Sequence, residues 1–459
     1  MGATVRMKRS CLLSEDSDFS IYQIALWLKK FLRARALRSN RQIHAVLVTS
    51  GIGLNVFSLG SKLLGVYASC GEMKSAIRVF EKIQYPNAFA LNWMILASAF
   101  NGDYKDAIGY FCLMQKSMHI YNKFTFSIVL KACIGLLDVK KGKEVHAIVK
   151  QLGLDNDVFM ADALVDMYSK CGSVCHARKV FDRMVKRDVT SWTSMICGYC
   201  IVGKVDQALI FFERMKMDGL EPNDFTWNTM IAGYARRGDS YEAFSFLSRM
   251  TGAGLLPNLV TWNTMISGFV ESQRAVEAVR VFCNMLASGI RPNIVTLTGL
   301  LPAYGTIGSI QRGKEIHGLI YRMGLYSNVF LVSALIDMYS KCGSVKDARN
   351  IFDKIRYKNV ASWNAMIGCY GKHGMVENSM QLFERMQEEG IWANDTTLIT
   401  ILSACSHNCC LEDGLRIFSL MKERYGIEPK REHYTCVIGM LCRSGRMVEA
   451  CELMKQMNT

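Results

Sequence analysis

Apolar residues recur at helical spacing in pairs of short runs, with a glycine between the two runs of each pair. The clearest first run places Trp227, Ile231 and Tyr234 at i, i+4 and i+7, so these side chains share one face of a predicted helix. Thr226 precedes them and is placed to cap that helix, and Gly238 ends the run. We therefore expect a first helix that buries one face, followed by a turn at the glycine.

The second run repeats this spacing at Ala243, Leu247 and Met250 and predicts a second helix. The small Ala243 lets the two helices approach closely. Gly254 lies near the end of this helix, where a residue able to adopt positive φ is favoured, and Pro257 ends the run. The pattern thus indicates a helix–turn–helix repeat.

This repeat is written three times in succession, over residues 188–222, 223–257 and 258–292. The three openings read DVTSWTSMICGYC, NDFTWNTMIAGYA and NLVTWNTMISGFV, which place Trp192, Trp227 and Trp262 at one spacing. A repeat of this length is typical of stacked supersecondary units, none of which can bury its apolar face alone. We therefore predict an all-α fold in which helix pairs stack into one elongated array.

The pattern extends over nearly the whole chain after residue 19, with repeats of three lengths in alternation. Five of the six prolines close a repeat, and only Pro302 falls within a predicted helix. The uncharged window from Pro292 to Gln311 has the length of a membrane span, but its prolines and glycines predict two segments with a loop. The predicted repeats are residues 20–55, 56–86, 87–121, 122–156, 157–187, 188–222, 223–257, 258–292, 293–327, 328–358, 359–393 and 394–429, followed by an incomplete repeat at 430–459.

Composition and charge fit a folded protein with a polyanionic partner. Half of the residues are hydrophobic and 21% are charged, which is not the composition of a disordered chain. Fifty-five basic side chains against 40 acidic ones give a net charge of +15, which suits binding to a polyanion. The 17 cysteines are not spaced as a disulfide framework, so we interpret them as thiols in a reducing compartment.

Residues 1–19 form the one clearly non-repetitive segment. Arg6, Lys8 and Arg9 precede its first acidic residue, Glu15, and transit peptides are poor in acidic residues. The segment is therefore a candidate transit peptide, and an untargeted terminus is the alternative.

Several motifs identify a family resemblance. The stretches VTWNTMI, ALIDMYSKCG, GKEIHG and GIRPN, together with the alternation of standard, long and short repeats, resemble the plant subclass of pentatricopeptide repeat proteins that alternates these three types. The resemblance covers nearly everything after residue 19. Tetratricopeptide repeats also stack helix pairs, but they fit the alternating lengths and the Pro-Asn junctions poorly.

The resemblance implies a right-handed superhelical α-solenoid that binds single-stranded RNA along its concave face, with about one base per repeat. In this family a base is read by the sixth residue of a repeat together with the first residue of the next, which we call a reading pair. The family's pyrimidine pairing is Asn–Asn, and its adenine pairing is Thr or Ser with Asn. The Asn–Asn pairs are Asn92 with Asn122, Asn228 with Asn258, Asn263 with Asn293, and Asn364 with Asn394. The adenine pairs are Thr193 with Asn223, Ser61 with Asn87, and Ser333 with Asn359.

Four further pairs depart from this pattern. They are Ser127 with Asp157, Asp162 with Asp188, Thr298 with Asn328, and Ile399 with Lys430. The first and third belong to long repeats, which are read less reliably in the family; the second has no assignment, and the last has no polar reader. The expected RNA track, 5′ to 3′ along the chain, is A, pyrimidine, two unassigned bases, A, two pyrimidines, one uncertain base, A and pyrimidine. Helix capping alone is an alternative explanation for Asn and Thr at these positions.

No catalytic or metal-binding motif emerges. The zinc deaminases that end many proteins of this subclass need His-x-Glu and Pro-Cys-x-x-Cys, whereas the one Cys-x-x-Cys here, Cys197 to Cys200, falls within a repeat helix. We therefore predict no deaminase domain, no enzyme activity, no metal and no cofactor. Two His/Cys clusters are interpreted as structural, as are the helix-packing residues His146 and His317. The clusters are Cys171, Cys175 and His176, and Cys405, His407, Cys409 and Cys410.

The resemblance leads to an expected function. The chain is expected to be an organellar RNA-binding adaptor that selects sites for C-to-U RNA editing, with a deaminase recruited in trans. Transcript stabilisation or processing without editing is the first alternative, and a protein-binding helical scaffold is the second. Mitochondrion is the expected location, with chloroplast as the alternative. No membrane or small-molecule partner is expected.

Overall fold

The computed structural model describes residues 17–34, 36–50, 53–54, 58–117 and 121–458. Residues 1–16, which hold most of the candidate transit peptide, lie outside the described residues. The chain divides into two compact units, Met1–Thr226 and Trp227–Thr459, each of which is described by itself.

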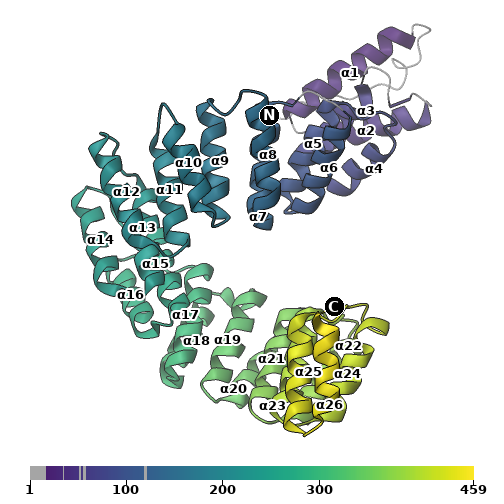
Figure 1. The fold of residues 1–459 in the computed structure, drawn as a ribbon. Coiled ribbons are helices and arrows are strands. Elements are labelled where there is room, and N and C mark those ends of the chain that lie inside the picture. The colour runs from purple at the N-terminus through teal and green to yellow at the C-terminus, as the bar shows by residue number, and fades with distance from the viewer. Residues whose placement is uncertain (1–16, 35, 51–52, 55–57, 118–120, 459) are drawn as a thin grey trace. The chain divides into compact units, whose positions relative to one another are not determined.

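The described residues form α-helices and no β-strand, as the spacing of apolar residues predicts (Figure 1). The first unit contains α1 (Ser17–Ala34), α2 (Leu37–Thr49), α3 (Leu59–Ser69), α4 (Met73–Glu81), α5 (Ala88–Phe100), α6 (Tyr104–Lys116), α7 (Lys123–Leu136), α8 (Val139–Gln151), α9 (Val158–Lys170), α10 (Val174–Arg183), α11 (Val189–Ile201) and α12 (Val205–Met217). The division between the units falls within α13 (Asp224–Arg237).

The second unit continues in the same way. It contains α14 (Ser240–Gly252), α15 (Leu259–Glu271), α16 (Ala275–Ala287), α17 (Ile294–Ile307), α18 (Ile310–Arg322), a 3-10 helix η3 (Leu325–Ser327), α19 (Val329–Lys341), α20 (Val345–Lys354), α21 (Val360–Lys372), α22 (Val376–Glu388), α23 (Asp395–His407), α24 (Leu411–Glu423), α25 (Arg431–Arg443) and α26 (Met447–Asn458).

Each repeat supplies one helix to each of two layers. The odd-numbered helices, which come first in their repeats, contact one another in succession: α3 contacts α5, α5 contacts α7, and α7 contacts α9; in the second unit α15 contacts α17 and so on to α25. Even-numbered helices pack on the first helix of their own repeat in both units, and most also contact the next first helix. Each unit is thus an α-solenoid of stacked helical repeats. The layer of first helices carries all the expected reading pairs.

Large apolar side chains fill the space between the two layers. Trp192 of α11 is 4% exposed and packs edge-on against Phe181 of the preceding second helix, with ring centroids 4.9 Å apart. Trp363 of α21 packs against Phe352 in the same way, at 5.0 Å. The repeated tryptophan is therefore a packing residue that ties consecutive repeats together.

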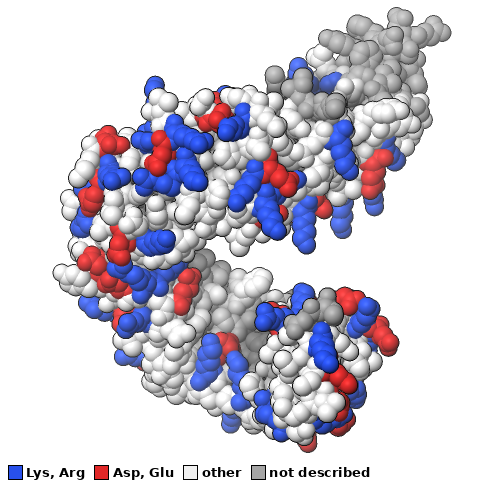
Figure 2. All heavy atoms as spheres, in the orientation of Figure 1, with Lys and Arg blue, Asp and Glu red and all other residues white. Residues whose placement is uncertain are grey.

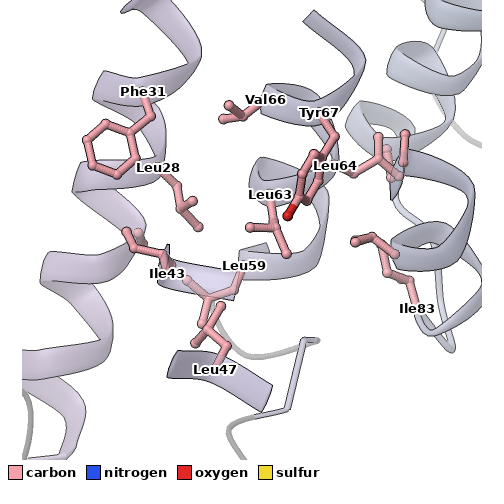
Figure 3. Close-up of a cluster of buried hydrophobic side chains, with 14 of the residues drawn as sticks. Leu28, Phe31, Ile43, Leu47, Leu59, Leu63, Leu64, Val66, Tyr67 and Ile83 are labelled. Atoms are coloured by element: carbon pink, nitrogen blue, oxygen red, sulfur yellow. The ribbon is translucent and has the colours of Figure 1, made fainter. Parts of the chain in front are cut away.

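The first three helices show how the array begins. Leu28 of α1 and Ile43 of α2 point toward Leu59 and Leu63 of α3 in one buried cluster (Figure 3). Because Leu28, Leu59 and Leu63 are fully buried, this N-terminal repeat already has a solenoid-type core.

Small residues let consecutive first helices approach closely. A Cβ added at Gly198 of α11 would lie 2.7 Å from the Cβ of Ser169 in α9, and one added at Gly268 of α15 would lie 2.6 Å from the Cβ of Ala235 in α13. Both distances are too short for a side chain, so alanine would push the helices apart. Close packing here brings the C-terminal parts of consecutive first helices together.

Two expectations about irregular segments hold. Pro302 lies within α17, and the uncharged window forms the separate helices α17 and α18, with Gly308 in the left-handed conformation between them. Among the residues that the structure describes, no helix is long and apolar enough to cross a membrane.

Candidate nucleic-acid interface

The first residue of most repeats caps the first helix of that repeat. In α15, Asn258 Oδ1 accepts hydrogen bonds from the amides of Val260 and Thr261, at 2.9 and 3.1 Å. The same cap, with Oδ1 accepting from the amide three residues on, is formed by Asn87, Asn122, Asp157, Asp188, Asn223, Asn293, Asn328, Asn359 and Asn394. Capping therefore occupies Oδ1, and an Asn at this position keeps its Nδ2 as a donor.

The expected cap at Thr226 is wrong. Asn223 caps α13, and Thr226 donates both its amide and its hydroxyl to Asn223 Oδ1, each at 3.0 Å. Thr226 is instead the fourth residue of its repeat, inside the first turn of the helix. Its hydroxyl points back to the residue that precedes the helix.

Two expected reading pairs are in direct contact. Ser61 Oγ donates to Asn87 Oδ1 at 3.0 Å, and Asn263 Nδ2 donates to Asn293 Oδ1 at 3.4 Å. The side chains of the sixth residue of one repeat and the first residue of the next therefore lie next to each other, between neighbouring first helices.

Three pairs are bridged by a hydroxyl that sequence reasoning did not assign to the site. Thr125 donates to both Asn92 and Asn122, at 2.5 and 2.9 Å. Thr296 bridges Asn263 and Asn293 at 2.6 and 3.0 Å, and Thr226 bridges Thr193 and Asn223 at 2.8 and 3.0 Å. The sequence could have indicated this bridging residue, because most repeats have Ser or Thr at the fourth position. That position lies three residues after the capping residue and therefore faces it.

The remaining pairs share no hydrogen bond within the described chain. Asn228 and Asn364 each have an Oδ1 that is shielded from solvent and has no partner. Asn258 and Asn394, their partners, are used only as caps. A shielded polar atom without a partner is rare in folded proteins, and it marks a place where a ligand group can bind.

Two more expected pairs are also apart. Ser333 Oγ donates to the carbonyl of Val329 within its own helix, whereas Asn359 caps α21. Thr298 Oγ1 is shielded without a partner, and Asn328 caps α19. The structure therefore places the seven assigned pairs, and also Thr298 with Asn328, on consecutive first helices, but joins only some of them.

An exposed apolar row runs beside the reading pairs, and sequence reasoning missed it. The third residue of many repeats is aromatic or β-branched and between 43% and 69% exposed, although it lies in the first turn of a packed helix. The row consists of Phe89, Phe124, Phe159, Phe225, Val260, Val295 and Phe330. The rings of Phe124 and Phe159, in consecutive repeats, have centroids 6.1 Å apart. The sequence could have indicated this row through an apolar residue one position outside the buried face, in openings such as NDFTW and NLVTW.

A basic row lies at the other end of the first helices. It occupies the fourteenth position of several repeats and consists of Lys170, Arg236, Lys341, Lys372 and Arg443. Acidic residues partly neutralise it: Arg236 pairs with Glu271 at 3.0 Å, and Asp337 pairs with Lys341 at 2.9 Å and Lys372 at 3.4 Å. Lys and Arg side chains also lie over other helices of both units (Figure 2).

In the second unit a cavity reaches from one reading position to the basic row. It has a volume of about 280 Å³ and is lined by α19, α21 and α23, including Asn364, Gly368, Lys372, Ser403 and His407. The reading position and the basic end of the helix therefore open onto the same hollow.

Several cysteines and histidines have packing roles. Cys133 and Cys405 are buried, and burial raises the pKa of each thiol to about 12, so neither is a reactive thiolate. His146 and His317, expected to pack between helices, share hydrogen bonds with the hydroxyls of Tyr168 and Tyr339 at 3.0 and 3.1 Å. No group of three or more His, Cys, Asp or Glu side chains in this part of the chain could hold a metal ion.

Comparison with known proteins gives a consistent result. Models of the PPR repeat family match residues 187–227, 257–306 and 358–407, and PPR repeat models match residues 160–189, 218–251, 330–360, 396–425 and 425–458. Pentatricopeptide repeat-containing protein At5g59600 of Arabidopsis thaliana is 38% identical over 425 residues, which cover 93% of this chain and 79% of that protein. The chain spans about half or less of other relatives from this plant: 51% of At2g33680, at 30% identity over 97% of this chain, and 33% of the chloroplastic At4g18520, at 34% identity over 46% of this chain.

The fold has a solved counterpart. The crystal structure of the pentatricopeptide repeat protein PPR10 in complex with an 18-nt psaJ RNA element matches 87% of this chain and 64% of that chain, with a TM-score of 0.54 and 20% identity. At this identity the likeness concerns the fold alone. The repeat models and the relative that aligns along most of both sequences establish that the chain belongs to the pentatricopeptide repeat family.

Proposed function

We propose that this protein binds single-stranded RNA sequence-specifically, with one base per repeat at the reading pairs. One observation carries the proposal: repeat after repeat places a polar pair beside an exposed apolar side chain, in the same position of consecutive first helices. Such a surface offers a stacking platform and an edge-reading group to each base. PPR10, whose fold this chain shares, was solved with an RNA element bound.

The atoms left free at the Asn228–Asn258 pair suit a pyrimidine. Asn258 has used its Oδ1 as a helix cap and offers Nδ2 as a donor, and Asn228 offers an unpartnered Oδ1 as an acceptor. Uracil and cytosine both present a donor next to an acceptor on the Watson–Crick edge, so either base can satisfy both groups. Neither group would otherwise have a partner.

The pairs with Thr or Ser suit a larger base. Thr193 already shares hydrogen bonds with Thr226 and the carbonyl of Val189, and it is only 3% exposed. Its contribution is therefore mainly its small size, which leaves room for a purine, while Asn223 offers Nδ2 to adenine N1. The RNA we propose is 5′-A-Y-N-N-A-Y-Y-N-A-Y, where Y is a pyrimidine and N is unassigned.

The basic row is proposed to hold the RNA backbone. Its Lys and Arg side chains lie at the far end of the first helices, and the cavity beside Asn364 reaches from the reading position to Lys372. Phosphate contacts of this kind release counterions, so the affinity should fall steeply as salt rises.

We further propose that the protein acts in a plant organelle and selects sites for C-to-U editing with a deaminase supplied in trans. The relatives are plant proteins, and At4g18520 is named as chloroplastic. Mitochondrion remains our expectation for the location, with chloroplast as the alternative. Transcript stabilisation or processing without editing is the second candidate role.

The first test is binding of the full chain to the proposed 10-mer and to a scrambled RNA of equal composition, at several salt concentrations. We expect tighter binding to the 10-mer at every salt concentration. Equal affinity for both RNAs would refute base reading. RNA sequencing of both organelles in a loss-of-function line then separates the roles: one lost editing site supports site selection, whereas intact editing with an altered transcript end supports processing.

A further inference from the structure

One reading pair differs from all the others in its hydrogen-bonding character. Asp162, the sixth residue of its repeat, lies in α9, and Asp188, the first residue of the next, caps α11. Ser191 takes the place of the bridging Thr of other repeats, and its hydroxyl donates to Asp188 Oδ1 at 3.0 Å. The pair therefore keeps the local geometry but replaces two amides or hydroxyls by two carboxyl groups.

Asp188 offers a base no donor. Its Oδ1 accepts from the amide of Ser191 at 2.9 Å and from the Ser191 hydroxyl, as in the other caps. An Asn here would keep Nδ2 as a donor, but Asp keeps a second acceptor oxygen. The Nδ2 donor that Asn offers at the first position of most other repeats is missing here.

Asp162 has an acceptor without a partner. Its Oδ1 is shielded from solvent and makes no hydrogen bond, and neither Asp162 nor Asp188 forms an ion pair in the described part of the chain. The pKa of Asp162 is raised to about 6, mainly by burial and also by the charge of Asp188, against the opposing effect of the Ser191 hydroxyl. Such an oxygen gains most from a ligand that brings N–H groups.

We propose that the Asp162–Asp188 pair selects guanine at the fourth nucleotide of the bound RNA, an inference that rests on the proposed function. Guanine presents two adjacent donors, N1–H and N2–H, on its Watson–Crick edge. These two N–H groups can donate to the two carboxylate acceptors that the pair offers. Carboxylates are well suited to accept hydrogen bonds from the N–H groups of bases.

The other bases fit less well. Adenine and cytosine each bring one amino group, and a ring nitrogen beside it would face a carboxylate oxygen. Uracil brings a single N3–H between two carbonyl oxygens, which the carboxylates would repel. Phe159 lies three residues before Asp162 on the same helix face and is 49% exposed, so a purine can stack on it while its edge meets the pair.

The test uses the full chain and four RNA 10-mers of the proposed track that differ only at the fourth nucleotide. Binding is measured at pH 7.5 in the presence of EDTA, so that no divalent cation can bridge the carboxylates. We expect the guanine RNA to bind about tenfold more tightly than the other three. Equal affinity for the four 10-mers, all above a scrambled RNA, would overturn the guanine inference and leave the proposed function intact. If none of the 10-mers binds better than the scrambled RNA, the proposed function itself fails.

Two variants confirm the source of the preference. Asp188→Asn keeps the helix cap and restores the donor, and we expect it to remove most of the preference for guanine. Asp166→Asn is the matched control, because it removes the same charge one turn further along α9, where Asp166 pairs with Lys170 at 2.8 Å. The control should change the affinity for all four RNAs by the same factor. A guanine preference that survives Asp188→Asn would contradict the proposal.

Discussion

The two long repeats at 122–156 and 293–327 carry nearly the same motifs, but their reading pairs differ in whether the polar side chains already have partners. In the first, Ser127 Oγ donates to the carbonyl of Phe124 at 3.0 Å, and Asp157 forms an ion pair with Lys123. In the second, Thr298 Oγ1 is shielded and has no partner, and Asn328 is used only as a cap. We call the first pair closed and the second open, because only the second has a shielded polar atom without a hydrogen-bond partner.

A few residues make this difference. The second residue of the first repeat is Lys123, which reaches Asp157 across the junction, whereas the equivalent residue of the other repeat is Ile294, which cannot form an ion pair. Pro302 of α17 also lacks the N–H that would bond the carbonyl of Thr298. A shared motif therefore does not decide whether a repeat can read a base; the second residue and the contacts around the pair do.

The largest effect is expected where two Asn–Asn pairs follow one another. Asn228→Ala combined with Asn263→Ala removes the polar reader at two adjacent pyrimidine positions. We expect the matched RNA to lose a few kcal/mol of binding free energy, on the basis of roughly 1–3 kcal/mol per base, measured by fluorescence anisotropy. Ser127→Ala, at the closed pair, should have no measurable effect. If the double variant weakens the binding of a scrambled RNA by the same amount, these residues do not read the base sequence.

A smaller effect is expected at the open long repeat. Thr298→Ala removes one unpartnered hydroxyl, and we expect a loss of about 1 kcal/mol in binding, which is the typical value of one hydrogen bond. The loss should depend on the base at the eighth nucleotide of the RNA. If Thr298→Ala and Ser127→Ala have the same effect, the distinction between open and closed pairs is wrong.

The sequence predicted the fold well because packing repeats itself. The helical spacing of Trp227, Ile231 and Tyr234 can be recognised in the amino-acid sequence, and all three side chains are buried as expected. Pro302 inside a helix and the Gly254 turn, with φ of 84°, were also predictable from local chemistry.

The site was predictable only in part. The position of the readers follows from the register of the repeat, but their hydrogen bonds depend on the neighbouring repeat. Thr226 was assigned as a cap because Thr is a good cap, yet Asn223 three residues earlier takes that role. The exposed row around Phe124 and Phe159 was missed because an apolar residue next to a buried face looks like more core. The handedness of the solenoid and the assignment of bases stay predictions.

The closed pair can be opened by one substitution. Lys123→Ile reproduces Ile294 of the other long repeat and frees the carboxylate of Asp157. We expect a preference for one base at the third nucleotide of about 0.5–1 kcal/mol, which is within the range of an exposed ion pair. The overall affinity should fall slightly because a positive charge is lost. Lys123→Arg keeps the charge and the ion pair, and it should show no base preference at that nucleotide.

The smallest effect is expected in acid, where the closed pair loses its ion pair. A hydrogen bond from Lys123 holds the pKa of Asp157 below its usual value. A lowered pKa means that the stabilisation is present above the unfolded pKa of about 3.9 and is lost as pH falls through the folded value. Asp157→Asn should therefore cost a few tenths of a kcal/mol at pH 7, measured by urea denaturation, and this cost should disappear as the pH falls below the lowered pKa of Asp157. Asp162→Asn should show the opposite trend: because the pKa of Asp162 is raised to about 6, its stabilising contribution is lost as pH rises through that value, and the variant should be the more stable protein at pH 7. Stability changes of one sign for both variants at pH 7 would show that the two carboxyl groups do not differ as their surroundings predict.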